Sequence, residues 1–95
     1  MPAVTRLGDA STGHGCFPSK VNLAGSSNVF INGIACHRIG DAWMTHGCGT
    51  CTPHGSVTAS GSGSVFVNGR AIARIGDGLT CGDTIAAGSG NVFAG

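Results

Sequence analysis

VNLAGSSNVF, residues 21–30, returns with small changes as VTASGSGSVF at 57–66 and as TIAAGSGNVF at 84–93. A second element, Arg-Leu/Ile-Gly-Asp, also occurs three times, at residues 6–9, 38–41 and 74–77. A loop separates each Arg-x-Gly-Asp from the ten-residue block that follows it. Repetition at this level predicts three copies of one supersecondary unit.

The two ends of the chain complete each other as parts of the repeat. The intact unit reads NVFINGIACHRIGD at residues 28–41, whereas AVTRLGD at 3–9 is its back half and NVFAG at 91–95 its front half. Joining the ends would create a third copy, so we expect three units around a pseudo-threefold axis with both termini in one place. An open solenoid would need distinct capping repeats, and none is visible in the sequence.

The composition favours short strands and tight turns. Among 95 residues Gly is the commonest with 18, while Glu, Gln and Tyr are absent. Strong helix formers are therefore scarce and residues that accept unusual backbone angles are abundant. We expect one domain, residues 1–95, of the all-β class, built from three pseudo-threefold repeats of short β-hairpins, at a size where burial alone gives marginal stability.

Two kinds of turn divide each unit. The Ser-Ser or Ser-Gly pairs at 26–27, 62–63 and 89–90 separate short apolar stretches and predict a first hairpin. The pairs Asn32-Gly33 and Asn68-Gly69 predict type I′ turns with positive φ at both positions. Residues 29–31 and 65–67 then form buried strands, and we expect the repeated aromatic side chains to meet near the axis: Phe30, Phe66 and Phe93.

The charged residues predict a structural role. Three of the five basic and three of the four acidic residues belong to the Arg-x-Gly-Asp units, and the net charge is +1. Without a basic stripe, nucleic-acid binding on one face is not expected. We expect the Asp to accept backbone N–H bonds at the start of its loop and the Arg to pair with the Asp of a neighbouring unit.

Nothing in the sequence predicts a membrane span or a secretion signal, and an odd number of Cys excludes a complete set of disulfides. Synthesis in a reducing cytosol is therefore the expectation. Of the nine His and Cys, seven lie in the three loops: His14, Cys16, His46, Cys48, Cys51, His54 and Cys81. Loops that leave one edge of three equivalent units converge, so this set predicts a four-ligand zinc site.

Other interpretations remain open at this point. The loop residues could be free thiols and incidental histidines, or a small thiol- or metal-binding module, in which several thiols would be reactive. A zinc hydrolase would need a general base, for which Asp83 is the candidate outside the repeats. Outside the loops, we expect Cys36 to be a small core residue, His37 to face solvent or a partner, and Trp43 to pack at the base of the second loop.

The repeated Gly-Ser-x-x-Val-Phe-x-Asn-Gly blocks, the Arg-Ile-Gly-Asp endings and the loop DAWMTHGC at 41–48 resemble the PAAR-repeat family over essentially the whole chain. The Pro-Ala-Ala-Arg segment that gives the family its name reads IACHR at 34–38 and AIAR at 71–74, without the proline. The difference affects the strand before Arg and leaves the surrounding motif intact.

This resemblance implies a conical or pyramidal tip, not an enzyme, that caps a trimeric β-helical spike in a type VI secretion system or a contractile phage tail. The spike would be of the valine-glycine repeat type or a phage central spike, with one tip monomer per trimer and transient contact with the target membrane. We expect assembly in the cytoplasm, then injection with the spike or a place at the virion tail tip, without an effector domain of its own.

The resemblance also implies one structural zinc ion, held by three His and one Cys. By motif these are His14, His46, His54 and Cys81. Three cysteines exceed that set and are possible substitutes, with Cys48 or Cys51 able to replace His46; they are Cys16, Cys48 and Cys51.

Overall fold

The computed structural model describes residues 2–13, 19–48 and 51–95, with the backbone alone for 45–48 and 51–54. Three two-stranded antiparallel sheets make up its regular structure. They pair β1 (Phe30–Ile31) with β2 (Ile34–Ala35), β3 (Ala42–Cys48) with β4 (Cys51–Val57), and β5 (Phe66–Val67) with β6 (Arg70–Ala71). The described residues form no helix, so none there is suited to crossing a membrane. The all-β expectation is confirmed.

A closed ring of three backbone hydrogen bonds joins the repeats. Thr5 N–H donates to the carbonyl of Ala73 at 2.9 Å, Ala73 N–H to His37 at 3.1 Å, and His37 N–H to Thr5 at 3.1 Å. Three further equivalent bonds join the same segments in the opposite sense around the axis: Leu7 N to Ala35 O, Ile39 N to Ala71 O and Ile75 N to Ala3 O, at 2.8 to 3.0 Å. Each unit therefore pairs with both others, and the predicted pseudo-threefold axis passes through the ring.

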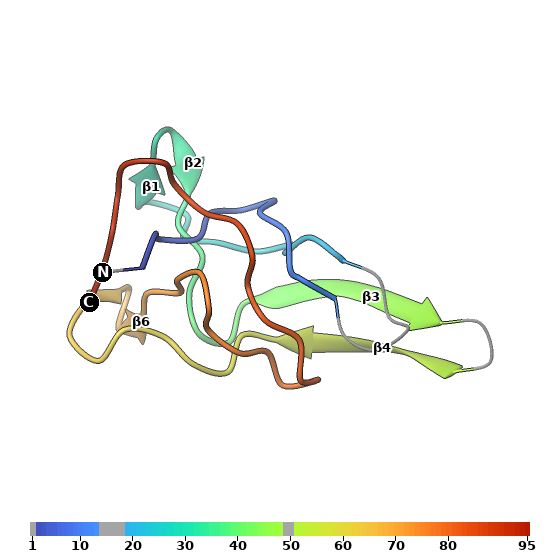
Figure 1. Cartoon of the computed structure of the whole chain (residues 1–95). Coiled ribbons are helices and arrows are strands. Elements are labelled where there is room, and N and C mark those ends of the chain that lie inside the picture. Colours follow the sequence, from blue (N-terminus) through green and yellow to red (C-terminus); the bar gives the residue numbers. More distant parts are fainter. Residues whose placement is uncertain (1, 14–18, 49–50) are drawn as a thin grey trace.

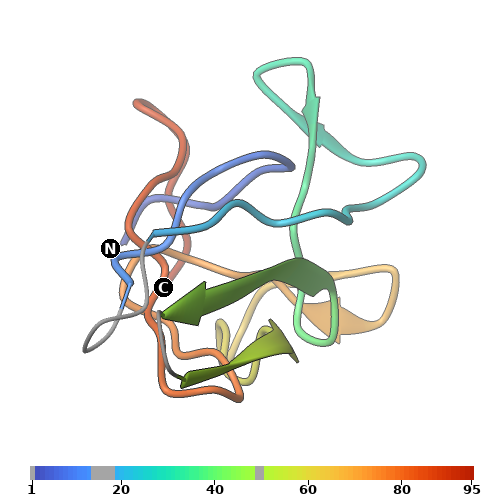
Figure 2. The same ribbon diagram turned by 90° about the vertical axis from the view of Figure 1, so that its right-hand side faces the viewer.

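The termini meet where the third unit is interrupted. Ala3 and Phe93 form an antiparallel bridge, and Ala94 N–H donates to Pro2 O at 3.1 Å. Figure 1 shows N and C side by side at the end that carries β1–β2 and β5–β6, while β3–β4 extends to the other end. The molecule measures 39 × 24 × 22 Å. Viewed along its length, the two short hairpins project on different sides (Figure 2).

The Asn-Gly turns have the predicted geometry. Asn32 and Gly33 have φ of 55° and 77°, and Asn68 and Gly69 have 54° and 78°. These angles are those of a type I′ turn, whose twist matches that of the paired strands. Each turn returns the chain directly, so Phe30 pairs with Ala35 in the first unit.

The Ser pairs do not form the predicted hairpin. Among the described residues, the stretches on either side of a Ser pair do not pair with each other: Leu23 N donates to Ala42 O, whereas Phe30–Ile31 pairs with Ile34–Ala35. The Ser itself makes a local turn, in which the Ser26 hydroxyl accepts the backbone N–H groups of Asn28 and Val29. Ser62 and Ser89 do the same in their units. The hydroxyl satisfies backbone donors that a paired strand would otherwise have bound.

These Ser turns also connect the units. The Ser26 hydroxyl donates to Asn68 Oδ1 at 2.6 Å, and the Ser89 hydroxyl to Asn32 Oδ1 at 2.5 Å. In the third contact the Ser62 hydroxyl donates to the carbonyl of Gly95, which aligns with the two turn asparagines in the repeat. Each Asn-Gly turn thus binds the Ser turn of the next unit.

The apolar core lies on the axis, but the phenylalanines do not belong to it. Buried Val4, Cys36 and Ile72 occupy equivalent positions there, with Val67 and Ala94 packed against them. The repeated aromatic side chains are 57%, 60% and 49% exposed, in the order Phe30, Phe66 and Phe93. The prediction that they meet near the axis, within fully buried strands, is wrong. Side chains alternate along a strand, and here the residue after each Phe faces inward.

A glycine before each Ser turn allows two backbones to approach closely. A Cβ on Gly88 would lie 2.6 Å from Val4 O, on Gly61 2.7 Å from Ile72 O, and on Gly25 3.0 Å from Cys36 O. These carbonyls belong to the three core strands around the axis. Any side chain at these glycines would push a repeat away from the ring.

We predict that Gly61→Ala lowers the free energy of unfolding by about 1–3 kcal/mol, because the new methyl group must displace a backbone carbonyl. Gly63→Ala is the matched control two residues away, since its Cβ would meet nothing within 4 Å. That variant should stay within about 0.5 kcal/mol of the parent protein. Denaturant unfolding of both variants measures the difference, and equal stabilities would contradict the close-approach explanation.

Candidate functional site

Each loop begins at an Arg–Asp pair within one Arg-x-Gly-Asp motif, and Asp41 Oδ1 also accepts an N–H from Arg70 of another unit at 2.8 Å. Asp41 Oδ2 accepts both the backbone N–H of Arg38 at 2.9 Å and its Nε–H at 2.9 Å. Equivalent pairs join Arg6 to Asp9 and Arg74 to Asp77. The predicted structural role of Asp as a backbone acceptor is confirmed. The predicted pairing of Arg with a neighbouring unit is wrong, because a spacing of three residues across the Gly turn already brings the two side chains together.

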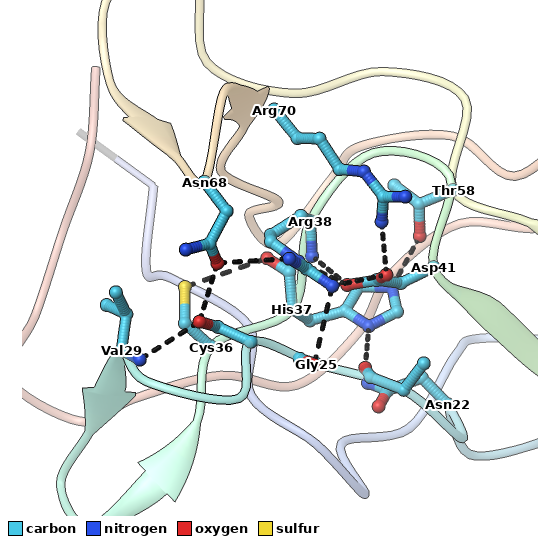
Figure 3. A network of polar contacts seen from close by, with 12 residues as sticks. Asn22, Gly25, Val29, Cys36, His37, Arg38, Asp41, Thr58, Asn68 and Arg70 are labelled. Atoms are coloured by element: carbon cyan, nitrogen blue, oxygen red, sulfur yellow. Dashed lines mark hydrogen bonds and ion pairs between the residues drawn. The ribbon is translucent and has the colours of Figure 1, made fainter.

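The second loop has an additional polar support beneath it (Figure 3). His37 is fully buried; its Nδ1 lies 2.7 Å from Ala24 O and its Nε2 2.7 Å from Thr58 Oγ1. Thr58 also accepts the indole N–H of Trp43 at 2.8 Å, and the two rings pack edge to face. The prediction that His37 faces solvent or a partner is therefore wrong. The packing role predicted for Trp43, which is 3% exposed, is confirmed.

Burial also shifts the pKa values of Cys36 and His37, the two residues that precede Arg38. Desolvation raises the pKa of the Cys36 thiol to about 11, so this core cysteine stays neutral, as its predicted core position requires. Burial lowers the pKa of His37 below 6.5, an effect that the Ala24 hydrogen bond partly offsets. Because the Ala24 carbonyl can only accept, the neutral ring carries its proton on Nδ1 and accepts from Thr58 at Nε2.

The second loop is itself a β-hairpin, which the sequence did not predict. Strands β3 and β4 pair antiparallel with irregular register, placing His46 opposite His54 and Cys48 opposite Cys51. Two of the predicted ligands, and two of their possible substitutes, are thus brought into cross-strand pairs by backbone hydrogen bonding. No regular alternation of apolar and polar residues marked these strands in the sequence, since Gly interrupts both of them and Pro53 interrupts β4.

The other two loops start beside this hairpin. Thr12 N–H donates to Thr84 O at 2.8 Å, which joins the first loop to the third. Thr80 N–H donates to Val57 O at 3.0 Å, which joins the third loop to the end of β4. The loop bases therefore converge at the end of the molecule opposite the short hairpins, as the repeat predicted.

Cys81 lies in this junction and has a neighbour that sequence reasoning missed. Its half-buried sulfur packs against the cluster of Trp43, Leu79 and Ile85, and lies 3.7 Å from Lys20 Nζ. Lys20 is 5% exposed and also donates to Ser56 Oγ at 2.8 Å. Nothing in the local sequence pattern of Lys20 indicated that its ammonium group would be buried.

The remaining predicted ligands are only partly within the described structure. His14 and Cys16 lie outside the described residues, and the side chains of His46, Cys48, Cys51 and His54 do as well. Among the side chains that are described, no three His, Cys, Asp or Glu form a group that could bind a metal. Cysteine sulfur and histidine nitrogen are nevertheless the donors that zinc prefers, so the donor chemistry of the converging loops fits this ion.

Asp83, the candidate base of the hydrolase interpretation, lies at the loop junction. Its side chain is 1% exposed and accepts the backbone N–H of Thr84 at 2.7 Å and the hydroxyl of Thr12 at 3.1 Å. These two bonds fix the first loop against the third. The described contacts of Asp83 are thus those of a structural anchor.

The described structure consists of three equivalent units closed into a ring, with loops that converge at one end. The sequence model of the PAAR motif matches residues 8–87, and the chain belongs to this family. Its members are structural spike-tip proteins of secretion and contractile injection systems, and the family implies association with a spike protein. No curated protein sequence matches the chain significantly.

We predict that stability decreases as the pH falls below about 6.5, because the unfolded chain takes up a proton at His37 before the folded protein does. Above that pH the contribution of neutral His37 is fully present. A series of unfolding measurements from pH 7.5 to 5 on the parent protein and on His37→Gln isolates this residue, since other acid-sensitive groups are common to both. Identical slopes in the two proteins would contradict the prediction.

Proposed function

We propose that this protein is the tip that binds the end of a trimeric β-helical spike and sharpens it for membrane puncture during contractile injection. The observation that carries the proposal is the closed ring of three equivalent units. One chain with pseudo-threefold symmetry can present the same contact to each of three identical spike chains. A single monomer per spike trimer follows from this match.

The docking face in this proposal is the broad end that carries β1–β2, β5–β6 and the termini (Figure 1). Phe30, Phe66 and Phe93 occupy equivalent positions of the three units there, and each is about half exposed or more. Three aromatic side chains repeated around an axis are suited to three equivalent pockets on a trimer, since buried aromatic groups commonly dominate binding energy. The three phenylalanines, which do not belong to the apolar core, would thus serve as anchors on the spike.

At the opposite end we propose one structural zinc ion, bound by His14, His46, His54 and Cys81, with Cys16, Cys48 and Cys51 as possible substitutes. Supporting observations are the convergence of the loop bases and the cross-strand pairing of His46 with His54. A fully protein-bound zinc would stabilise the loops, by about 10 kcal/mol in small zinc domains, and needs no open coordination position. We further propose assembly in the cytoplasm and delivery with the spike.

We predict one zinc ion per chain in the purified protein. His14→Ala and Cys81→Ser should each lose the metal and unfold at a markedly lower temperature, because each removes one of four ligands. Native mass spectrometry and thermal unfolding measure the two effects. Cys36→Ala serves as the matched control, since this buried cysteine lies on the axis among core residues. Metal-free but equally stable parent protein would contradict the zinc site.

We predict that the triple variant Phe30→Ser, Phe66→Ser and Phe93→Ser binds the spike trimer at least about 100-fold more weakly, because buried aromatic anchors often contribute 2 kcal/mol or more each. Its folding should be retained, since all three side chains are exposed. Leu23→Ser, at an exposed residue outside the three Phe positions, is the control. Mass measurement of the complex checks the stoichiometry; three tips per trimer, or full affinity of the triple variant, would contradict the docking model.

A further inference from the structure

Lys20 is a buried cation at the point where the three loops meet. Its side chain reaches Ser56 Oγ on β4 at 2.8 Å and Cys81 Sγ in the third loop at 3.7 Å, and Lys20 itself is the last residue of the first loop. The ammonium group of this residue therefore connects the first loop to the bases of the second and third loops. The residue is 5% exposed, although lysine is rarely buried without a partner.

The backbone of Lys20 is fixed as firmly as its ammonium group. Ser11 N–H donates to Lys20 O at 2.7 Å, and Lys20 N–H donates to Ser11 Oγ at 3.1 Å. Ser11 is also buried and lies in a bridge with Ile85 of the third repeat block. The side chain of Lys20 therefore extends toward Cys81 from a backbone position that two hydrogen bonds fix.

Among the described residues, no carboxylate forms an ion pair with Lys20. Its described side-chain partners are a hydroxyl and a sulfur. A buried ammonium is costly unless a negative or strongly accepting group faces it. A metal-bound cysteine is a thiolate, and a thiolate at Cys81 would be such a group.

We propose that Lys20 is a positioning residue for the metal centre, donating an N–H···S hydrogen bond to the metal-bound sulfur of Cys81. The inference rests on the zinc site proposed above and adds a residue outside the ligand set. Ser56 directs the ammonium group, Lys20 orients the sulfur, and the positive charge balances the thiolate. Residues that orient metal ligands in this way commonly change metal affinity by 10–100-fold when they are replaced.

The test compares the parent protein with Lys20→Met, Lys20→Arg and Ser56→Ala. Lys20→Met keeps a long side chain but removes the donor, Lys20→Arg keeps the charge and donors, and Ser56→Ala removes only the hydroxyl that directs the ammonium. Zinc affinity is measured by competition with a chromophoric chelator. Cobalt(II) replaces zinc as a spectroscopic probe, because its thiolate charge-transfer band reports hydrogen bonding to the sulfur.

We expect Lys20→Met to bind zinc at least about 10-fold more weakly and to shift the cobalt–thiolate band to longer wavelength, since a hydrogen bond lowers the energy of the sulfur electrons. Lys20→Arg should restore most of the affinity, and Ser56→Ala should show a smaller loss and shift. Thermal unfolding of the metal-free proteins separates these effects from a purely structural role, which would lower stability and leave affinity and spectrum unchanged.

Unchanged zinc affinity and an unchanged band in Lys20→Met would overturn the proposal while leaving the zinc site intact. If Lys20→Met does not fold, Ser56→Ala carries the same test, and an unshifted band in that variant would overturn the proposal. A parent protein that binds neither zinc nor cobalt would overturn the metal centre itself, and the role of Lys20 with it.

Discussion

The ring of hydrogen bonds among Thr5, His37 and Ala73 is the constraint on which the rest of the structure depends. It joins three strands from distant parts of the chain, and each strand must donate to one neighbour and accept from the other. The turns, the glycines that allow close approach and the Arg–Asp pairs all serve to place these three strands at equal depth. With so small a core, the repeated backbone pairing does much of what apolar burial does in larger domains.

The three units share the same backbone pairing in the ring, and they differ in the residues that support their loops. Equivalent ring positions carry Thr5, His37 and Ala73, and each serves the loop above it differently. Thr5 donates to Ala87 O, Ala73 joins the apolar cluster of Trp43 and Leu79, and His37 supports the residues that start and end the β3–β4 hairpin. A common scaffold thus carries one long hairpin and two shorter loops without losing its axis.

The two ends of the molecule have separate physical requirements. The broad end keeps equivalent aromatic groups exposed in all three units, and the proposed docking on a trimeric spike would cover them. The loop end instead gathers different residues from each unit, with Lys20, Ser56 and Cys81 meeting at its base. Symmetry at one end and asymmetry at the other are consistent with a tip that docks on a trimer and comes to a single point.

Features set by local chemistry could be predicted from the sequence. The Asn-Gly turns require positive φ and were found with it, and the split repeat required the termini to meet. Two of the wrong predictions concern which side chains of an extended segment face the core and which face solvent. Phe30 was expected to be buried and is exposed, whereas His37 was expected to be exposed and is buried. The sequence shows that side chains alternate along a strand, but it does not show which face meets the axis.

The sequence by itself determined the threefold repeat, the all-β class, the Asn-Gly turns and the family, because each depends on residues that recur at fixed spacing. Only the tertiary structure decided which groups become partners across the units. The hydrogen bond from the Ser26 hydroxyl to Asn68 and the burial of Lys20 against Cys81 are of this kind. Their physical reason is packing between segments far apart in the chain, which no local pattern encodes.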